Sequence, residues 1–347
     1  MPSGMPSPVP VGATVTVRVP ASSANLGPGF DSVGLALGVW DECRVTVVEA
    51  PGVAITVSGE GEGSVPLDAS HLVHRTMVTA WRELGVEPPV GLRLDCVNEV
   101  PHGRGMGSSA TAIVTGVVAA QALHTQTSGP SGRAGTAGDA PTSGRAGTAG
   151  DAPTSGADLD LDWAGDLASR LEGHPDNASA SVYGGLTLSW SDEPGVAGST
   201  RTVRLRPDPR VEVVVFVPVE QLSTARARSV LPVQVRLGDA AANSARAALL
   251  VHAATSDPSL LLPATREWLH QDARRPSYAA SMALVDRLRA AGHAAVISGA
   301  GPSVLVLGTR ESASAAADLA PRGWRVLRPG IPLRGAHLVE ASRPVGG

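Results

Sequence analysis

The chain has 347 residues, 43% of them hydrophobic, and a net charge of −4. This is enough for a sizeable core and indicates about two domains, and the absence of a basic stripe argues against nucleic acid as a partner. No apolar run reaches the ~18 residues of a membrane helix, and the Pro-rich start (residues 1–11) lacks signal-peptide features. We therefore expect a cytoplasmic protein, without a membrane partner, that begins with a disordered lead-in.

The sequence contains no lysine, so all 28 cationic side chains are arginine. This excludes enzymes that need a lysine amine, such as PLP enzymes and Schiff-base aldolases. It also excludes nucleotide sites built on a Walker A or protein-kinase lysine. If the chain handles ATP, phosphate must be neutralised by backbone N–H groups, a metal ion and arginine.

The first half of the chain predicts strands and helices by its hydrophobic periodicity. Alternating or apolar runs predict strands at 14–19, 43–49, 53–57 and 92–97. Helical spacing predicts helices at 71–84, 109–124 and 161–172. The two cysteines, Cys43 and Cys96, have no metal-type spacing, and we expect buried, reduced thiols.

An exact tandem repeat interrupts the pattern. The segment SGRAGTAGDAPT at 131–142 is copied at 143–154 and consists largely of small and turn-forming residues. It has nothing to bury, so we expect a disordered insert at 127–157 in a surface loop between two helices. The second half then predicts strands at 211–219, 294–298 and 303–307, and helices at 240–254 and 278–290.

The motif with the clearest chemistry is PHGRGMGSSAT, residues 101–111. It follows a predicted strand and opens a predicted helix, and its three glycines let the backbone approach an anion closely. The helix N-terminus then offers N–H groups and a positive dipole end, so the context favours phosphate binding. Ser108 and Ser109 are expected to cap the helix and to offer hydroxyls to a phosphate or metal.

Three further motifs allow a functional or a purely structural interpretation. Residues 20–37, PASSANLGPGFDSVGLAL, are equally typical of a loop with an Asx-turn and of a binding segment. Residues 171–185, LEGHPDNASASVYGG, gather polar side chains at a helix end, where a carboxylate near a phosphate loop suits Mg²⁺. Residues 298–307, SGAGPSVLVL, read as a tight turn between strands.

Together and in this order, the four motifs resemble those of the GHMP small-molecule kinases. The loop is similar to the family signature P-x-x-x-G-L-G-S-S-A, with Met106 in place of the usual leucine. Within the family, the second and third motifs most resemble those of the branch that acts on homoserine. The resemblance covers about residues 15–308, apart from the repeat insert.

The resemblance implies ATP-dependent phosphorylation of the L-homoserine hydroxyl, a step of threonine biosynthesis, with Mg²⁺ as cofactor. Glu172 and Ser109 would hold the metal, and His71 takes the place of the asparagine usual near the adenine. The residues implied to bind ATP are Pro101, His102, Gly103, Arg104, Gly105, Met106, Gly107, Ser108, Ser109, Ala110 and Thr111.

The resemblance also implies a substrate site and catalytic groups. Arg274 would clamp the substrate carboxylate, although the local sequence HQDARR departs from the family's H-E-P-Y-R and leaves Arg275 as the alternative. Asn177 would polarise the hydroxyl, with Asp176 as the alternative if a formal base exists. The residues implied to contact the substrate are Asn25, Asp31, His174, Asn177, Thr224, Arg228 and Arg274, with Arg228 also near the γ-phosphoryl group.

The implied fold is α+β with two domains. An N-terminal ATP-binding domain (12–189) would resemble the second domain of ribosomal protein S5, and a strand at about 335–344 would return to it. A C-terminal domain (190–334) would be ferredoxin-like, and a homodimer is compatible with the sequence. The alternatives are a GHMP kinase for mevalonate, a methylerythritol intermediate or a sugar, and a catalytically silent regulator on the same fold. A dinucleotide-binding oxidoreductase fits poorly, because Gly103, Gly105 and Gly107 lack the G-x-G-x-x-G spacing.

Overall fold

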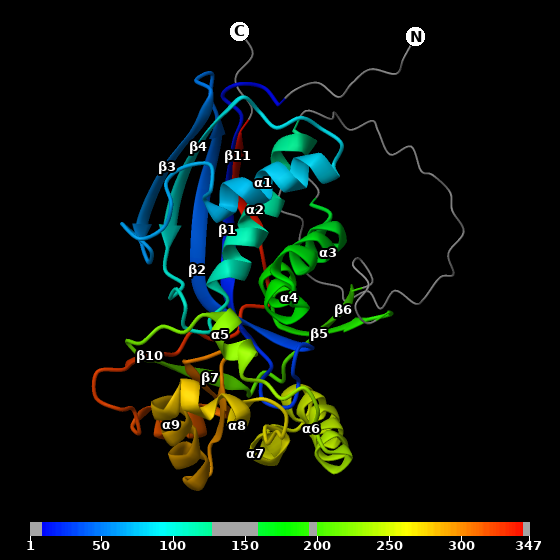
Figure 1. Ribbon diagram of the computed structural model, residues 1–347, viewed down its shortest axis with the longest axis vertical. Coiled ribbons are helices and arrows are strands. Elements are labelled where there is room, and N and C mark those ends of the chain that lie inside the picture. The colour runs from blue at the N-terminus through cyan, green and yellow to red at the C-terminus, as the bar shows by residue number, and fades with distance from the viewer. Residues whose placement is uncertain (1–8, 127–158, 194–199, 343–347) are drawn as a thin grey trace.

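The computed structural model describes residues 9–126, 159–193 and 200–342. These residues form an upper and a lower body, each built on one sheet (Figure 1). The predicted repeat insert and residues 1–8 of the predicted lead-in lie outside the described residues. No helix of the described part is long and apolar enough to cross a membrane.

The upper sheet has the central order β11-β1-β2-β4-β3, and β5 and β6 extend it from the first half of β2. Strands β3 and β4 are parallel, and the other pairs are antiparallel. The strands are β1 (Thr14–Ala24), β2 (Val33–Val47), β3 (Gly52–Gly59), β4 (Gly91–Asn98), β5 (Leu186–Ser191), β6 (Thr200–Leu205) and β11 (His337–Ser342).

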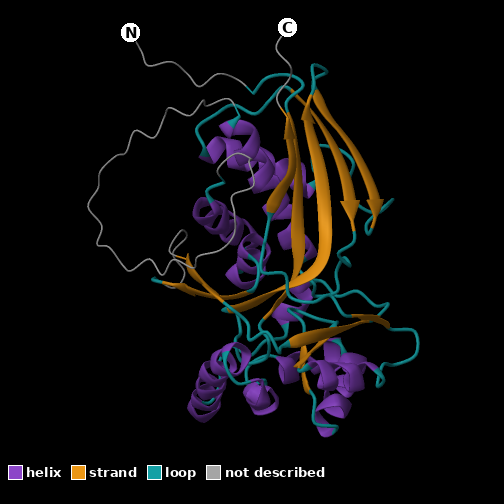
Figure 2. Cartoon of the chain, turned by 180° about the vertical axis from the view of Figure 1, so that it is seen from behind, coloured by secondary structure: helices purple, strands orange, loops and turns teal. Residues whose placement is uncertain are grey.

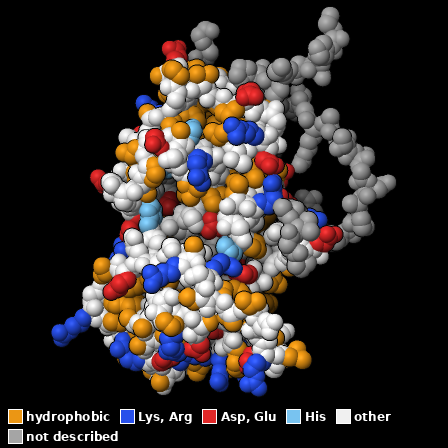
Figure 3. Space-filling model, viewed as in Figure 1, with side chains coloured by type: hydrophobic (Ala, Val, Ile, Leu, Met, Phe, Trp, Pro, Cys, Tyr) orange, Lys and Arg blue, Asp and Glu red, His pale blue; other side chains and the backbone are white. Residues whose placement is uncertain are grey.

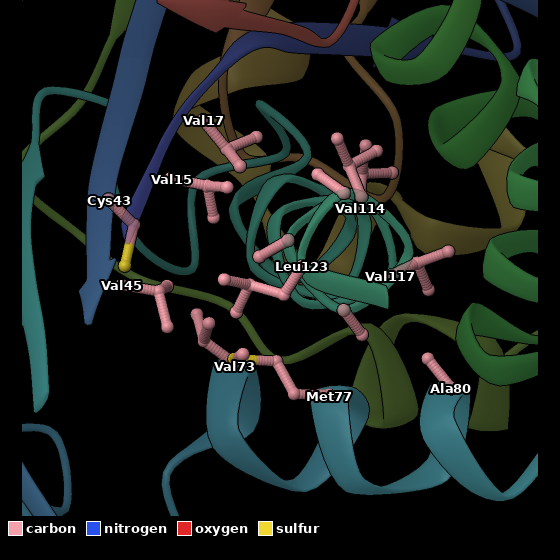
Figure 4. Packing of buried hydrophobic residues seen from close by; sticks show 14 of the residues in the cluster. Val15, Val17, Cys43, Val45, Val73, Met77, Ala80, Val114, Val117 and Leu123 are labelled. Carbon is pink, nitrogen blue, oxygen red and sulfur yellow. The ribbon is translucent and has the colours of Figure 1, made fainter. Parts of the chain in front are cut away.

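Four helices cover one face of the upper sheet, whereas the other face is free of helices (Figure 2). They are α1 (Leu72–Glu83), α2 (Ser108–Thr125), α3 (Leu161–Glu172) and α4 (Pro175–Tyr183). Helix α2 is the centre of this body, and its small residues are buried almost all round. Figure 4 shows Val114, Val117 and Leu123 on different sides of α2, with Val15 of β1 and Met77 of α1 also facing this helix. A buried central helix fixes the position of its own N-terminus, where the glycine loop lies.

The lower sheet has the antiparallel order β10-β7-β9-β8. Its strands are β7 (Glu212–Val217), β8 (Ala294–Ile297), β9 (Val304–Gly308) and β10 (Arg325–Leu327). The helices of this body are α5 (Thr224–Ser229), α6 (Leu237–Thr255), α7 (Leu261–Ala264), α8 (Gln271–Arg274), α9 (Ala279–Ala290) and α10 (Arg310–Ala317), with 3₁₀ turns at Pro258–Leu260 and Arg275–Ser277.

The two bodies share one apolar core. Along β7, Val213 and Val215 point to a cluster that also contains Leu35 and Met106 of the upper body, whereas Phe216 points to a separate cluster with α9 and α10. This alternation is why β7 reads as a continuous apolar run. The shared core holds the glycine loop against the lower sheet, although the expected boundaries 12–189 and 190–334 stay a prediction.

The loop interpretation of residues 20–37 is wrong except at its centre. β1 continues to Ala24 and β2 already begins at Val33, so only residues 25–32 form a turn. The small polar residues of this segment hid the strands, because the buried Ser22 and Ser23 form hydrogen bonds, with Asn177 and Ser298, instead of an apolar face.

Candidate active site

The loop between β4 and α2 is shaped for close approach to an anion. Gly103, Gly105 and Gly107 all have positive φ. A Cβ atom at Gly105 would overlap the carbonyl oxygen of Ser298, and one at Gly107 would overlap the hydroxyl of Ser22, so both positions require glycine. The first N–H groups of α2 have no intrahelical acceptor and, with the helix dipole, favour negative charge here.

The predicted serine cap of α2 is wrong. Ser108 is already the first helical residue, and the N-cap position is the left-handed Gly107, without a side-chain cap. Ser109 instead donates to Glu172 Oε1 at 2.6 Å, so a hydroxyl and a carboxylate meet at the first turn of α2. Burial raises the pKa of Glu172, and the bond from Ser109 opposes this only partly.

Asp41 ties the two ends of the loop together and was missed by the sequence analysis. Its carboxylate accepts from the backbone N–H groups of Glu99 (2.9 Å) and Val100 (3.0 Å) and from the hydroxyl of Thr111 (2.8 Å). Desolvation raises the pKa of Asp41 despite these bonds. The available signal was an aspartate inside a strand, a residue type that strands disfavour.

A cavity between the two bodies is lined by residues of all four motifs. In Figure 3, acidic, histidine and basic side chains cluster at the junction between the upper and the lower body. Of the predicted residues, His102 lines a second, adjacent cavity, and Pro101, Arg104, Met106, Ala110 and Thr111 line neither. Those that line the first cavity are Asn25, Asp31, Gly103, Gly105, Gly107, Ser108, Ser109, Glu172, His174, Asp176, Asn177, Thr224, Arg228 and Arg274.

The turn at residues 25–32 presents Asp31 to this cavity. Asn25 accepts from the N–H of Asp31 through Oδ1 (3.0 Å) and donates through Nδ2 to the carbonyl of Gly299 (2.9 Å). Asn25, Leu26 and Asp31 all have positive φ, which costs energy in non-glycine residues and is held by these contacts. The carboxylate of Asp31 is paired with Arg228, whose Nη2 lies 2.6 Å from Oδ1.

Arg274 and Arg275 have different surroundings. The side chain of Arg274 is 1% exposed and lines the cavity, where it donates to the carbonyl of Ala227 (2.9 Å) and to Nδ1 of His270 (3.2 Å). Burial lowers the pKa of Arg274. Arg275 instead pairs with Asp272 (2.8 Å) and Asp286 (2.7 Å), so its charge is already neutralised outside the cavity.

The α4 segment supplies three neighbouring polar groups. Burial raises the pKa of Asp176 to about 7, and the charge of Asp31 adds to this, whereas burial lowers the pKa of His174. Asn177 accepts from the hydroxyl of Ser22 at 3.1 Å. The site therefore holds a neutral amide and, beside it, a carboxyl group whose pKa lies near neutrality.

The second cavity, of about 250 Å³, shares Ser108 and Ser109 with the first and is mainly apolar. Cys43 and Cys96 line it and face each other across β2 and β4, with sulfur atoms 3.3 Å apart. Both thiols are free and buried, which confirms that expectation, although the sequence did not indicate their proximity. His71 also lines this cavity, and burial lowers the pKa of its ring.

Comparison with known proteins identifies the fold and the family. Residues 71–133 match the model of the GHMP kinase N-terminal domain, and residues 247–324 match that of the C-terminal domain. The structure of homoserine kinase from Cytophaga hutchinsonii superposes with a TM-score of 0.76 at 24% identity, over 94% of this chain and 97% of that one. Mevalonate kinase of L. major gives 0.63 at 15% identity, over 94% and 99%. The predicted two-domain α+β GHMP fold is thereby confirmed.

Proteins of similar sequence identify the family more narrowly than the solved structures do. Homoserine kinase of Streptomyces avermitilis is 45% identical over 330 residues, which are 95% of this chain and 97% of that protein. Homoserine kinase of Clavibacter michiganensis is 40% identical over 348 aligned positions, which cover 98% and 99%. Such identity over nearly the full length of both proteins exceeds what a shared fold alone requires, and the chain belongs to the homoserine kinases of the GHMP kinase family.

Proposed function

We propose that the chain transfers the γ-phosphoryl group of ATP to the hydroxyl of L-homoserine, giving O-phospho-L-homoserine and ADP. The observation that carries this proposal is that Asp31 and Arg274 line the same cavity as the glycine loop. Homoserine is a zwitterion with a primary hydroxyl, so its recognition needs an anion, a cation and a phosphate site within one cavity.

The charges of the cavity suit this substrate. Arg274 is buried, and its hydrogen-bond partners among the described residues, the Ala227 carbonyl and His270, are neutral acceptors. A substrate carboxylate would therefore supply the missing negative charge. Asp31 is free to exchange its partner, because the Asp31–Arg228 pair is about one-third exposed on both sides. The substrate ammonium would replace Arg228 at Asp31, and Arg228 would turn to the carboxylate or the γ-phosphoryl group.

The nucleotide would lie across the N-terminus of α2. Its phosphates would bind at the glycine loop, and its base would enter the apolar second cavity, which adjoins the loop through Ser108 and Ser109. The buried Nδ1 of His71 has no hydrogen-bond partner among the described residues and lines this cavity. A purine edge offers such a partner, which would take over the role of the family's asparagine.

Mg²⁺ fits the donors at the first turn of α2. Glu172 and Ser109 place one carboxylate and one hydroxyl beside the phosphate site. The described residues contain no cluster of three metal-binding side chains. Two protein donors would be enough for Mg²⁺, which often takes one or two protein ligands and completes its shell with phosphate oxygens and water. The ion would neutralise charge on the β- and γ-phosphates.

For the transfer itself, we propose that Asn177 orients the substrate hydroxyl, with His174 and Thr224 completing the wall of the substrate cavity. The phosphoryl-transfer transition state is loose, so positioning and charge neutralisation supply most of the rate. Asp176 is the alternative proton acceptor, since its pKa of about 7 suits a general base.

The test is ADP release in a coupled assay with homoserine, mevalonate and galactose as acceptors. We expect turnover with homoserine and little with the other two, which lack the ammonium group. Preferred turnover of mevalonate or galactose would contradict the proposal. We also propose a cytoplasmic location, supported by the two free thiols and the need for ATP.

A further inference from the structure

Phe30 lies at the centre of the cations that surround the proposed substrate site. Its ring stacks on the ring of His270, with centroids 4.8 Å apart and an interplanar angle of 19°. The guanidinium carbon of Arg274 lies 5.5 Å from the Phe30 centroid, and that of Arg228 lies 5.8 Å from it. One aromatic ring thus contacts both arginines and the histidine that binds one of them.

The stacked histidine is neutral. His270 Nε2 lies 2.9 Å from the carbonyl oxygen of Gly27, which can only accept, so Nε2 carries the proton. His270 Nδ1 is then the acceptor for the Arg274 guanidinium at 3.2 Å. Burial lowers the pKa of His270, which agrees with an unprotonated acceptor. The stack therefore adds no positive charge and orients one edge of Arg274.

The two guanidinium groups face an electrostatic problem that the ring eases. Arg228 is neutralised by Asp31, but no described carboxylate forms an ion pair with Arg274. Two cations on one cavity wall repel each other, most strongly when Asp31 turns to the substrate ammonium. The face of an aromatic ring carries partial negative charge and attracts cations within about 6 Å. A leucine of similar size would fill the space but supply none of this attraction.

We propose that Phe30 is a positioning residue whose ring holds Arg228 and Arg274 together so that both can receive the substrate carboxylate. This inference rests on the proposed function and adds a determinant of substrate affinity. Phe30 neighbours Asp31 in the chain, so one short turn would set both the anionic and the cationic half of the site. Asn25 holds the turn through its bonds to Asp31 and Gly299.

The experiment compares Phe30→Leu and Phe30→Tyr with the wild type, each with two acceptors. Homoserine carries the carboxylate, whereas 3-amino-1-propanol keeps the hydroxyl and ammonium without it. We expect Phe30→Leu to lower kcat/KM for homoserine about 5- to 30-fold, which corresponds to ~1–2 kcal/mol for two cation–π contacts. The loss should lie in KM, with kcat and the KM for ATP changed less than about twofold, and Phe30→Tyr should remain near the wild type.

The carboxylate-free acceptor separates positioning from general damage. Phe30→Leu should change its kcat/KM less than about twofold, because this acceptor has no carboxylate for the two arginines to bind. Phe216→Leu is the matched control, since Phe216 is the other phenylalanine and lies buried in β7, away from the cavity. It should lower the melting temperature and leave the kinetic parameters unchanged.

Two results would overturn the inference. One is an equal loss for both acceptors, which would assign Phe30 a structural role. The other is an unchanged KM for homoserine in a folded Phe30→Leu protein. If that variant does not fold, Phe30→Met decides by the same criteria. A wild-type protein that does not phosphorylate homoserine would refute the proposed function instead. Wild-type activity with homoserine is therefore measured before any variant is tested.

Discussion

Replacing Arg274 with leucine tests the substrate assignment most directly, and Arg275→Leu is its matched control. The two arginines are adjacent in sequence, but Arg274 is 1% exposed and lines the cavity, whereas Arg275 is bound by Asp272 and Asp286 at the surface. The two substitutions remove the same side chain from different surroundings. We expect Arg274→Leu to weaken substrate binding with little change in stability, and Arg275→Leu to lower stability slightly with little change in substrate binding.

The magnitude follows from the contacts of each side chain. The Arg274 guanidinium has five N–H donors, and two of them bond to Ala227 and His270, which leaves donors for a carboxylate. An unmade charged hydrogen bond costs about 1.5–3 kcal/mol, so Arg274→Leu should raise the KM for homoserine roughly 10- to 150-fold. Its stability should change little, because a buried cation without a carboxylate partner is itself unfavourable. Arg275→Leu loses two half-exposed ion pairs, worth at most about 1 kcal/mol each.

The assay is steady-state ADP release with homoserine and ATP varied in turn, together with melting temperatures. Arg274→Leu should leave the KM for ATP nearly unchanged, and Arg274→Lys should restore homoserine binding only in part, because lysine lacks the bidentate fork. A selective homoserine defect in Arg275→Leu and not in Arg274→Leu would show that the carboxylate assignment is wrong by one residue. A defect in neither would mean that the acceptor has no carboxylate at this position.

Three further predictions follow from the surrounding groups. Glu172→Gln should raise the Mg²⁺ concentration needed for half-maximal activity and lower kcat, and superimposable Mg²⁺ titrations of variant and wild type would refute the metal assignment. Asp176→Asn should raise the melting temperature more at pH 8 than at pH 5. The pKa of Asp176 is raised from 3.8 to about 7 on folding, so the folded wild type loses stability, at most about 4 kcal/mol, as pH rises through this window. An equal effect of the substitution at both pH values would contradict this prediction. Labelling of Cys43 or Cys96 by a small uncharged thiol reagent should slow when ADP is bound, and unchanged labelling would place the base outside the second cavity.

Periodicity and local motifs predicted much of the fold. Helix α3 was predicted to the residue, and β4, α2 and α9 within one or two residues, because their apolar spacing is strong and their ends are marked by glycine or polar residues. The glycine loop was recognised because three glycines between a strand and a helix have few other uses. Strands β5, β6 and β10 were missed. Exposed arginines and short length leave β6 and β10 without a clear apolar face.

Contacts between distant segments could not be predicted in the same way. Asp41 and Thr111 are 70 residues apart, and nothing in either local sequence names the other as partner. Cys43 and Cys96 are opposed only because β2 and β4 pair in one register, which depends on the whole sheet. Sequence reasoning thus singled out residues by their own local motif and missed Asp41, which holds another motif in place.

The pair of Arg228 with Asp31 shows why the proposed site can remain open to its substrate. A carboxylate and an arginine in a cavity would each be costly to desolvate alone, and the pair satisfies both in the absence of ligand. A bound zwitterion brings one ammonium and one carboxylate, so it can exchange partners with this pair without leaving a charge uncompensated. Arg274 adds a cation that the protein itself does not neutralise with an ion pair among the described residues. The net electrostatic attraction of the site for its substrate therefore depends on the substrate carboxylate. An amino alcohol without a carboxylate would only replace Arg228 as the partner of Asp31.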